Sequence, residues 1–392
     1  MLASRTRELM AQSSDVPAKR VVINTIPLQG SLTGVGHYIS QLTRHFNLLD
    51  DHNEYTYYYG FFSKNLVGSD HPIQRIRNQL PKTPWFRKAV RQSVFALSGL
   101  FHSEFDLYFE PNFIPVKIRA KKIVTTVHDF SFRLFPEAHP KDRIQYFKKH
   151  FSKNIRRSDR IITDSVYIKS EASGLLGLPD EIITPVHLGV DHDVFKIYPR
   201  EALESCKREL GLPENFILFV GTREPRKNLE RLVRAYAELP QQIRSEFGLV
   251  LVGPHGWGEG HRSVGEQLGG RITVLDYVEI YKLAQIYNLA SVLVYPSLYE
   301  GFGLPPLEAM ACGCPVIASR AASLPEVCGD AACYVDPKDV QSIAEGMDRV
   351  LKHEELRWSL IQRGTERAKL FSWEKTAQET LKVFDEVLRP AN

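Results

Sequence analysis

The sequence predicts an α/β protein made of two doubly wound, parallel-sheet domains with an interdomain crevice. Three observations lead to this prediction. Short β-rich segments alternate with helical patterns along the chain, which is typical of parallel sheets flanked by helices. The alternation starts afresh at FILFVG, residues 216–221. A chain of 392 residues is also too long for one ordinary hydrophobic core.

The first half contains four strand-like segments and two helical ones. The expected strands are RVVINTI (20–26), EYTYYYGFF (54–62), KIVTTVHD (122–129) and RIITDS (160–165), and the expected helices are GHYISQLTRHF (36–46) and VYIKSEASGLLG (166–177). In the second half, strands are expected at 216–221, 247–253, 271–276, 291–297 and 315–319, and NLERLVRAYAEL (228–239) is expected to be a helix. No internal repeat or low-complexity segment interrupts this order.

The predicted boundaries follow from the second start of the pattern. We expect a first domain at 1–193, a linker at 194–205, a second domain at 206–371, and a final segment at 372–392. Ligands of open parallel sheets bind outside the carboxyl ends of the strands. The loops that follow the strands, on either side of the predicted crevice, are therefore the segments to inspect for chemistry.

The composition excludes several classes of protein. Hydrophobic residues make up 43% and charged residues 24%, which fits a soluble globular chain. The first twenty residues have no secretory core, and no run of eighteen apolar residues occurs, so we expect a cytoplasmic protein without a membrane span. The five cysteines lack a paired CxxC pattern and indicate reduced thiols. Cys312-Gly313-Cys314 is the nearest approach to a metal pair, and structural packing is the favoured interpretation.

The charge is unevenly distributed between the halves. Residues 1–200 hold 28 Lys+Arg against 19 Asp+Glu, a net +9, and the remainder holds 22 against 27, a net −5. Basic residues cluster at 82–101 and 141–160 among apolar and aromatic ones. Such a helix can lie on an anionic membrane surface or form a solvated face, and both interpretations stay open. Nucleic acid is not an expected partner, because no recognition motif accompanies the charge.

Two glycine-rich or basic loops have phosphate-binding character. GSLTGVGHY (30–38) lies between a strand and a helix, so its glycines allow backbone N–H groups to approach a phosphate, although a plain tight turn is equally compatible. TREPRKN (222–228) places Arg223, Arg226 and Lys227 just before a helix. Two guanidinium groups and an ammonium there predict a pyrophosphate site, and surface charges at a helix start are the alternative.

The stretch PSLYEGFGLPPLEAM (296–310) carries two carboxylates. After a strand and a GFG turn, Pro305 and Pro306 suit the start of a helix that Gly313 would end. We expect Glu308 in the first helical turn, receiving hydrogen bonds from a ribose diol, and Glu300 before the glycine turn. A pair of acids that cuts a glycosidic bond is the alternative.

Two further polar motifs are candidates for ligand binding. His128 ends a strand beside Asp129 and is predicted to face the ligand, although a lone histidine is often structural. Asp191-His192-Asp193 spells DxD, which can hold a divalent cation. A metal is not expected here, because the basic residues already balance the phosphate charge.

These motifs resemble the retaining family-four glycosyltransferases of the two-domain GT-B architecture, especially the bacterial mannosyltransferases that build surface polysaccharide. The resemblance covers nearly the whole chain and is most specific in PRKN and in the E-x7-E pattern of Glu300 and Glu308. It implies a metal-independent hexosyltransferase without a cofactor, whose co-substrate is a nucleotide-diphosphate sugar, with GDP-mannose favoured. The acceptor would be a lipid-linked or growing oligosaccharide in O-antigen, capsule or exopolysaccharide synthesis, reached from the inner face of the membrane.

The resemblance also implies that the domain at 1–193 binds the acceptor, that the domain at 206–371 binds the donor, and that residues 372–392 form a helix returning to the first domain. It implies roles for individual residues as well. Glu308 would bind the donor ribose, Glu300 the sugar hydroxyls, and His128 the sugar, while Lys227 and Arg226 would stabilise the diphosphate. The remaining donor-binding residues would be Gly34, Gly36, Thr222, Arg223, Tyr277, Val278, Gly301, Phe302, Gly303 and Leu304. In three places the sequence departs from the family: Thr222 replaces an arginine, His37 stands at the usual basic position, and Asp276 precedes Tyr277. Asp276 would accept hydrogen bonds from guanine, and an exposed loop acid without that role is the equal alternative.

The sequence leaves alternative functions open. They are a UDP-sugar-dependent glucosyl- or N-acetylhexosaminyltransferase, an epimerase or phosphorylase on the same architecture, and a non-catalytic nucleotide-sugar-binding subunit. An epimerase would need a further acid pair, which the sequence does not show.

Overall fold

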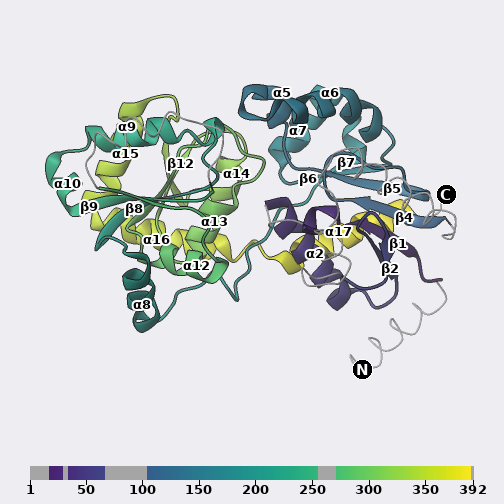
Figure 1. Ribbon diagram of the computed structural model, residues 1–392, viewed down its shortest axis with the longest axis horizontal. Coiled ribbons are helices and arrows are strands. Elements are labelled where there is room, and N and C mark those ends of the chain that lie inside the picture. The colour runs from purple at the N-terminus through teal and green to yellow at the C-terminus, as the bar shows by residue number, and fades with distance from the viewer. Residues whose placement is uncertain (1–16, 30–33, 67–103, 255–270, 390–392) are drawn as a thin grey trace, which may run out of the picture. The chain divides into compact units, whose positions relative to one another are not determined.

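The computed structural model describes residues 17–29, 34–66, 104–254 and 271–389. The basic segment 82–101 and the first part of the glycine loop, 30–33, lie outside these residues. The described chain forms two compact units (Figure 1). The first comprises 1–126, 153–161 and 377–392, and the second comprises 127–152 and 162–376.

Within the described residues, the first sheet has seven strands in the order β3-β2-β1-β4-β5-β6-β7. Their bounds are β1 (Arg20–Asn24), β2 (Glu54–Tyr58), β3 (Phe62–Ser63), β4 (Phe105–Glu110), β5 (Ala120–Val127), β6 (Arg160–Thr163) and β7 (Ile183–Pro185). Strand β1 pairs in parallel with β2 and β4, β4 pairs in parallel with β5, and β3 is antiparallel to β2. Parallel pairs of this kind require crossover connections: a helix at 34–49 lies between β1 and β2, whereas an irregular segment at 111–119 joins β4 to β5.

Helices α2 (Gly34–Leu49) and α17 (Trp373–Leu388) contribute to the first unit. The ring centre of Phe384 on α17 lies 5.6 Å from that of Phe46 on α2 and 5.1 Å from that of Phe109 on β4. Aromatic pairs at these separations add to the stabilisation from burial. Part of the carboxyl-terminal helix therefore belongs to the core of the unit that the amino-terminal strands build.

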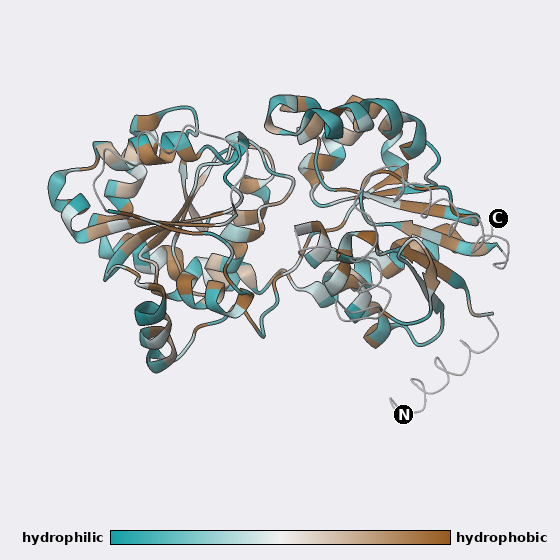
Figure 2. Cartoon of the chain, in the orientation of Figure 1, coloured by the Kyte–Doolittle hydropathy of each residue, from teal (hydrophilic) through white to brown (hydrophobic). Residues whose placement is uncertain are grey.

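In the part of the chain that the structure describes, the second sheet has six strands, all parallel, in the order β10-β9-β8-β11-β12-β13. Their bounds are β8 (Asn215–Val220), β9 (Phe247–Val252), β10 (Ile272–Leu275), β11 (Val292–Tyr295), β12 (Val316–Ser319) and β13 (Ala332–Val335). The strands are strongly apolar, and the residues of β8, β11 and β12 are almost all buried (Figure 2). Such continuous apolar runs are typical of parallel sheets covered on both faces.

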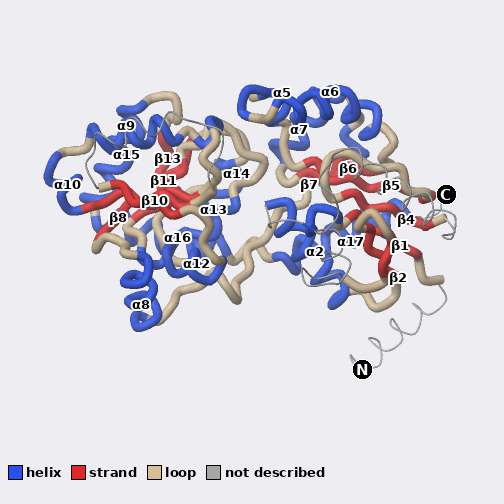
Figure 3. Tube along the Cα trace, viewed as in Figure 1, coloured by secondary structure: helices blue, strands red, loops and turns tan. Residues whose placement is uncertain are grey.

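The other α-helices of the described residues lie in the second unit, and helices flank both faces of the six-stranded sheet (Figure 3). Their bounds are α5 (Ser131–Leu134), α6 (Lys141–Ile155, which extends into the first unit), α7 (Val166–Leu176), α8 (Arg200–Leu210), α9 (Leu229–Glu238), α10 (Gln241–Glu246), α12 (Ile280–Leu289), α13 (Leu304–Ala311), α14 (Leu324–Cys328), α15 (Val340–Lys352) and α16 (Glu354–Ala368). Residues of α9, α15 and α16 join the sheet in one buried apolar cluster.

The structure confirms the predicted α/β class and every strand expected from the sequence. It adds β3, β4, β7 and β13, which the sequence pattern did not single out. Strand β4, FDLYFE, mixes acidic and aromatic residues and has no β-branched residue to mark it. Within the described residues, no helix is both long and apolar enough to cross a membrane.

Candidate active site

The loops that carry the predicted basic and acidic residues follow neighbouring strands at the topological switch point of the second sheet. Strands β8 and β11 pair directly, while their crossover connections run in opposite directions, to β9 and to β12. Strand β8 ends at Val220 and β11 at Tyr295, so the loops 221–228 and 296–303 leave the same edge side by side. Ligands of doubly wound sheets bind at such a point.

Hydrogen bonds tie the two loops together. The side chain of Asn228 donates to the carbonyl oxygen of Pro296 at 2.9 Å. The N–H of Leu298 donates to the carbonyl oxygen of Arg226, also at 2.9 Å. The Nη1 of Arg226 donates in return to the carbonyl oxygen of Tyr299 at 2.6 Å. The basic loop and the acidic loop therefore form one hydrogen-bonded structure, which fixes how they face each other.

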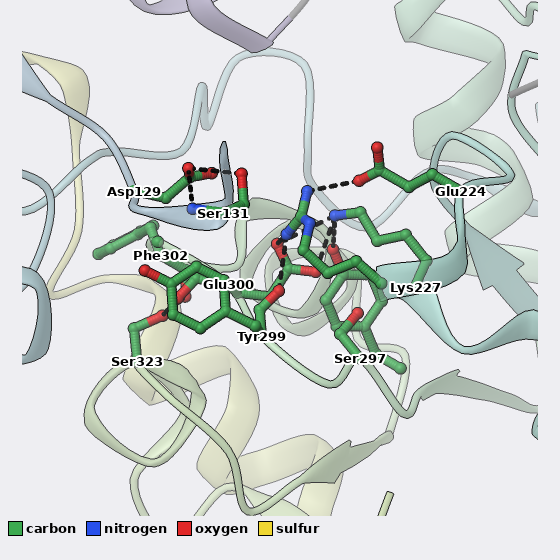
Figure 4. Close-up of polar contacts among 12 residues, drawn as sticks. Asp129, Ser131, Glu224, Lys227, Ser297, Tyr299, Glu300, Phe302 and Ser323 are labelled. Atoms are coloured by element: carbon green, nitrogen blue, oxygen red, sulfur yellow. Dashed lines mark hydrogen bonds and ion pairs between the residues drawn. The ribbon is translucent and has the colours of Figure 1, made fainter. Parts of the chain in front are cut away.

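The centre of this structure is a cluster of four charged side chains (Figure 4). The carboxylate of Glu300 accepts hydrogen bonds from the Nζ of Lys227, at 2.7 and 3.0 Å, and from the Nη1 of Arg226, at 2.9 Å. The Nη2 of Arg226 also donates to Glu224 at 2.5 Å. Both carboxylates are buried, and the two cations are nearly so. Buried charges of this kind persist because each is paired and hydrogen-bonded.

The cluster keeps Glu300 ionised. Burial alone would raise the pKa of the Glu300 carboxyl, but the charges of Lys227 and Arg226 lower it to about 2. The hydroxyl of Tyr295, at the end of β11, accepts a hydrogen bond from the Nζ of Lys227 at 2.8 Å. An anion that enters here must compete with Glu300 for the same two cations.

The second glutamate of the motif has a different environment. Glu308 lies in the second turn of α13, because the helix begins at Leu304; the prediction of the first turn was wrong by this offset. Its Oε2 accepts a hydrogen bond from the hydroxyl of Tyr287 at 2.9 Å. Burial raises the pKa of Glu308 to about 7, and the hydrogen bond from Tyr287 opposes that shift. Glu308 can therefore change charge near neutral pH, whereas Glu300 cannot.

The start and end of α13 follow the predicted signals. Proline occupies the first turn, where a missing N–H costs nothing, and Gly313 beyond the last turn has a φ of +71°. Gly303 precedes the helix with a φ of +110°, which disfavours any side chain. The hydroxyl of Ser323 donates to the carbonyl oxygens of Glu300 and Phe302, at 2.9 and 2.8 Å, and holds the turn in place.

Gly301 is required by a close contact. A Cβ at this position would lie 2.0 Å from the carbonyl oxygen of His128, which no side chain can tolerate. The carbonyl oxygen of Gly301 accepts a hydrogen bond from the hydroxyl of Ser165 at 2.9 Å. The structure thus brings the strand end at His128 directly against the glycine turn.

His128 is oriented by a buried aspartate. Its Nδ1 lies 2.9 Å from Oδ2 and 3.1 Å from Oδ1 of Asp164, and both side chains are buried. Burial raises the pKa of Asp164, and His128 opposes that shift. When Nδ1 carries the proton that Asp164 accepts, the lone pair of the neutral ring lies on Nε2. This arrangement suits a histidine that interacts with a ligand through Nε2.

Arg223 has a different partner from Arg226 and Lys227. Its guanidinium is buried and forms an ion pair with the exposed Asp276, which follows the end of β10. Thr222 is partly buried on the same loop, Val278 is partly buried, and Tyr277 is 76% exposed. The structure does not bring Arg223 into the charged cluster around Glu300.

The remaining predicted donor-binding residues lie in two places, at the glycine turn and in α2. Phe302 is buried in the turn, and Leu304 is the first residue of α13. Gly34 and Gly36 lie in the first turn of α2, in the first unit, and their role in donor binding stays a prediction.

Asp191 and His192 of the DxD motif make hydrogen bonds within the protein. The Oδ1 of Asp191 accepts from the N–H of Asp193 at 3.1 Å, and the Nε2 of His192 lies 3.0 Å from the carbonyl oxygen of Phe371. Cys312 and Cys314 are both buried, and burial raises the pKa of each thiol well above its ordinary value. In the part of the chain that is described, no group of three or more His, Cys, Asp or Glu side chains is arranged to hold a metal ion.

Sequence reasoning missed four side chains of the site. Glu224, Tyr287, Tyr295 and Asp164 each contact a predicted site residue. Glu224 lies within the quoted TREPRKN loop, and its position between two arginines was an available signal. The other three side chains are brought to the site only by the fold: Tyr287 lies on α12, Tyr295 ends β11, and Asp164 follows β6.

Comparisons with known proteins agree with this geometry. Residues 204–367 match the family model described as Glycosyl transferases group 1, and residues 32–194 match Glycosyltransferase Family 4. The O-antigen chain mannosyltransferase B of Escherichia coli is 32% identical over 386 residues, which cover 93% of this chain and 99% of the relative. The chain belongs to Glycosyltransferase Family 4.

Solved structures show the same fold. A sucrose-phosphate synthase from Thermosynechococcus elongatus has a TM-score of 0.70 and 20% identity, over 94% of this chain and 98% of its own. The Anabaena protein Alr3699/HepE, solved with UDP and glucose, has a TM-score of 0.69 and 16% identity, over 94% of this chain and 100% of its own. These likenesses confirm the predicted GT-B fold class of this glycosyltransferase.

Proposed function

We propose that this glycosyltransferase transfers mannose from GDP-mannose to an oligosaccharide acceptor of the O-antigen type, with retention of the anomeric configuration and without a metal ion. The observation that carries the proposal is the buried cluster of Lys227, Arg226 and Glu300 at the switch point of the second sheet. The similarity to an O-antigen mannosyltransferase along nearly the whole chain supports the choice of sugar.

The cluster suits a departing diphosphate. As the bond between sugar and phosphate loosens, negative charge develops on the phosphate oxygens. Two cations that the fold already holds in place stabilise that charge without reorganisation. The diphosphate would take over the hydrogen bonds that Lys227 and Arg226 now give to Glu300. The released Glu300 carboxylate could then accept hydrogen bonds from the sugar hydroxyls, the role that the family resemblance implies.

The other groups supply binding and orientation. Glu308 accepts hydrogen bonds from the ribose diol, and His128, oriented by Asp164, contacts the sugar through Nε2. The backbone N–H groups of the glycine turn at 301–304 complete the donor site. The departing phosphate can take the proton of the acceptor hydroxyl, so the transfer balances without another base: the sugar–phosphate bond breaks, the sugar–acceptor bond forms, and the proton ends on the nucleoside diphosphate.

A thermal-shift panel with GDP-, UDP- and ADP-sugars tests the donor, because a ligand that binds only the folded state raises its melting temperature. GDP-mannose should give the largest shift and should then support transfer to an oligosaccharide acceptor. The anomeric configuration of the product, determined by NMR, tests retention. A response to UDP-sugars alone would defeat the choice of GDP-mannose, and binding without transfer would favour a non-catalytic subunit.

We also propose that helix α6 contacts an anionic membrane surface by charge. Its apolar residues Phe147 and Phe151 are buried, and their ring centres lie 4.4 and 4.8 Å from that of Phe132, so they are not available for insertion. Lys148 and Lys149 are exposed on the helix. Anionic lipids attract such clusters, and salt screens that attraction.

Vesicle sedimentation tests this contact. The protein should sediment with phosphatidylglycerol vesicles at low salt, remain in the supernatant with phosphatidylcholine vesicles, and lose binding in the double variant Lys148→Glu/Lys149→Glu. Equal binding of this variant and the unmodified protein would leave α6 as a solvated face.

A further inference from the structure

The hydroxyl of Tyr299 links the two segments that the reaction uses. It accepts a hydrogen bond from the N–H of Phe130 at 2.9 Å and donates to the Oε2 of Glu171 on α7 at 2.5 Å. Tyr299 is 3% exposed, and these two hydrogen bonds satisfy its hydroxyl inside the protein. The side chain precedes Glu300 in the chain, and Phe130 follows His128 by two residues.

The main chain of Tyr299 has a second connection. Its carbonyl oxygen accepts the hydrogen bond from Arg226 at 2.6 Å. One residue therefore contacts the arginine of the charged cluster through its backbone and the histidine loop through its side chain. The ring itself packs against Phe135 and Tyr167, with centres 5.6 and 6.4 Å away.

Glu171 completes the connection. It is half-buried, and hydrogen bonds from Tyr299 and Tyr167 reach its carboxylate. Through Glu171, the middle of α7 fixes the Tyr299 hydroxyl in the orientation in which its lone pair faces Phe130. The tight contact between Gly301 and the carbonyl oxygen of His128 leaves little tolerance for a shift of either segment.

We propose that Tyr299 and Glu171 are a positioning pair for sugar transfer, which holds the His128 loop in register with Glu300 and Arg226. This inference rests on the proposed function. Neither side chain has to touch the donor. Their loss should therefore reduce the rate of the chemical step, which depends on alignment, more than it reduces donor binding.

The first test is Tyr299→Phe, which removes one oxygen and keeps the packed ring. We expect kcat to fall about tenfold, the effect of losing roughly one well-placed hydrogen bond, with the donor KM unchanged within about twofold. Tyr281→Phe is the matched control, because Tyr281 on α12 is 59% exposed. It makes the same chemical change and should leave both constants unchanged.

Glu171 supplies the second test, which stays informative if Tyr299→Phe folds poorly. Glu171→Ala should lower kcat to a similar extent, whereas Glu171→Gln keeps an oxygen that can accept the Tyr299 hydrogen bond and should restore most of the rate. Because the two residues act as one unit, the double variant Tyr299→Phe/Glu171→Ala should lose little more than the worse single variant. If the fold-losses in kcat of the two single variants multiply in the double variant, the two residues do not act as a pair and the proposal is overturned.

Hydrogen exchange provides a readout that does not depend on the donor. The Phe130 amide should exchange faster in Tyr299→Phe than in Tyr281→Phe, because its acceptor has gone. If the wild type is active and Tyr299→Phe has the same kcat as Tyr281→Phe, the positioning role is overturned and the proposed function is not. A wild type that transfers no sugar from any nucleotide donor would overturn the proposed function itself, and unchanged Phe130 exchange would show that the contact is not formed.

Discussion

The carboxylate of Glu300 lies 2.7 Å from the Nζ of Lys227. It therefore forms an ion pair with a cation that a donor diphosphate would need. Arg226 contacts the same carboxylate at 2.9 Å. The site is thus internally neutralised by a group that has to exchange partners when the donor binds. Removing the charge of Glu300 should therefore change the affinity for the diphosphate.

Glu300→Gln should bind free GDP about tenfold more tightly than the wild type and transfer sugar more slowly. The amide no longer competes as an anion for Lys227 and Arg226, so the diphosphate gains both. Titration calorimetry with GDP and steady-state rates with the sugar donor measure the two effects. Without nucleotide, the variant should also melt at a lower temperature, because it leaves two nearly buried cations with less compensation. Weaker GDP binding by Glu300→Gln would show that Glu300 does not compete with the diphosphate.

Glu308 should make donor binding depend on pH. In the proposed donor site, the ionised carboxylate accepts hydrogen bonds from both ribose hydroxyls, and its pKa of about 7 leaves it largely protonated at pH 6. The donor KM should therefore fall about tenfold as the pH rises from about 6 to about 8, and binding near pH 7 should release protons. Calorimetry in two buffers with different ionisation enthalpies measures that release.

The control for this dependence is Glu308→Gln, which has a similar shape and no titrating group. Its donor KM should be high and nearly constant over the same pH range. A pH-dependent KM that persists in Glu308→Gln would assign the titration to another group.

The parts of this site that sequence could predict are those encoded in one continuous stretch. Lys227 and Arg226 precede a helix, Glu300 and Glu308 flank a glycine turn, and strand order places both loops at one edge. The partners of these residues are distant in sequence. Asp164 is 36 positions from His128. No local pattern encodes such a contact, since it depends on which strands become neighbours.

The charge states of Glu300 and Glu308 could not be predicted from the sequence either. Glu300 and Glu308 are the same residue type eight positions apart, yet burial beside two cations keeps one ionised and burial beside the hydroxyl of Tyr287 lets the other titrate near neutral pH. The position of Glu308 in the second helical turn also depends on the helix starting at Leu304, a boundary that the proline pair defines only to within about one residue.

Gly301→Ala should abolish most of the activity. Its methyl group would lie 2.0 Å from the carbonyl oxygen of His128, so the turn or the histidine loop has to move. A displacement of about 1 Å at a reacting group can cost roughly a hundredfold in rate. Steady-state rates and melting temperature measure the effect.

Gly174→Ala is the matched control for this substitution. Gly174 lies in α7, with nothing within 4 Å of the position that a Cβ would take. Alanine in a helix interior should stabilise the protein by about 0.5–1 kcal/mol and leave the rate unchanged. Normal activity in Gly301→Ala would mean that the contact with His128 is absent in solution.

Metal removal should have little effect on activity. In the proposed mechanism, Lys227 and Arg226 supply the positive charge that a divalent ion would otherwise bring to the diphosphate. The kcat/KM in excess EDTA should therefore stay within about twofold of the untreated value. Loss of activity in EDTA with recovery on added manganese would instead assign a metal role, with Asp191 and Asp193 as the first ligands to test.

Asp276 should contribute to the choice of nucleobase. Its exposed carboxylate is oriented by the buried guanidinium of Arg223, and a carboxylate fixed in this way can accept from the N1 and N2 protons of guanine. Asp276→Asn should therefore raise the KM for a GDP-sugar about tenfold, with little change for any UDP-sugar that is used. Asp330→Asn is the matched control, because Asp330 is also exposed and lies 3.8 Å from an arginine, Arg363. An equal rise for both donors in Asp276→Asn would mean that the Arg223–Asp276 pair supports the loop without recognising guanine.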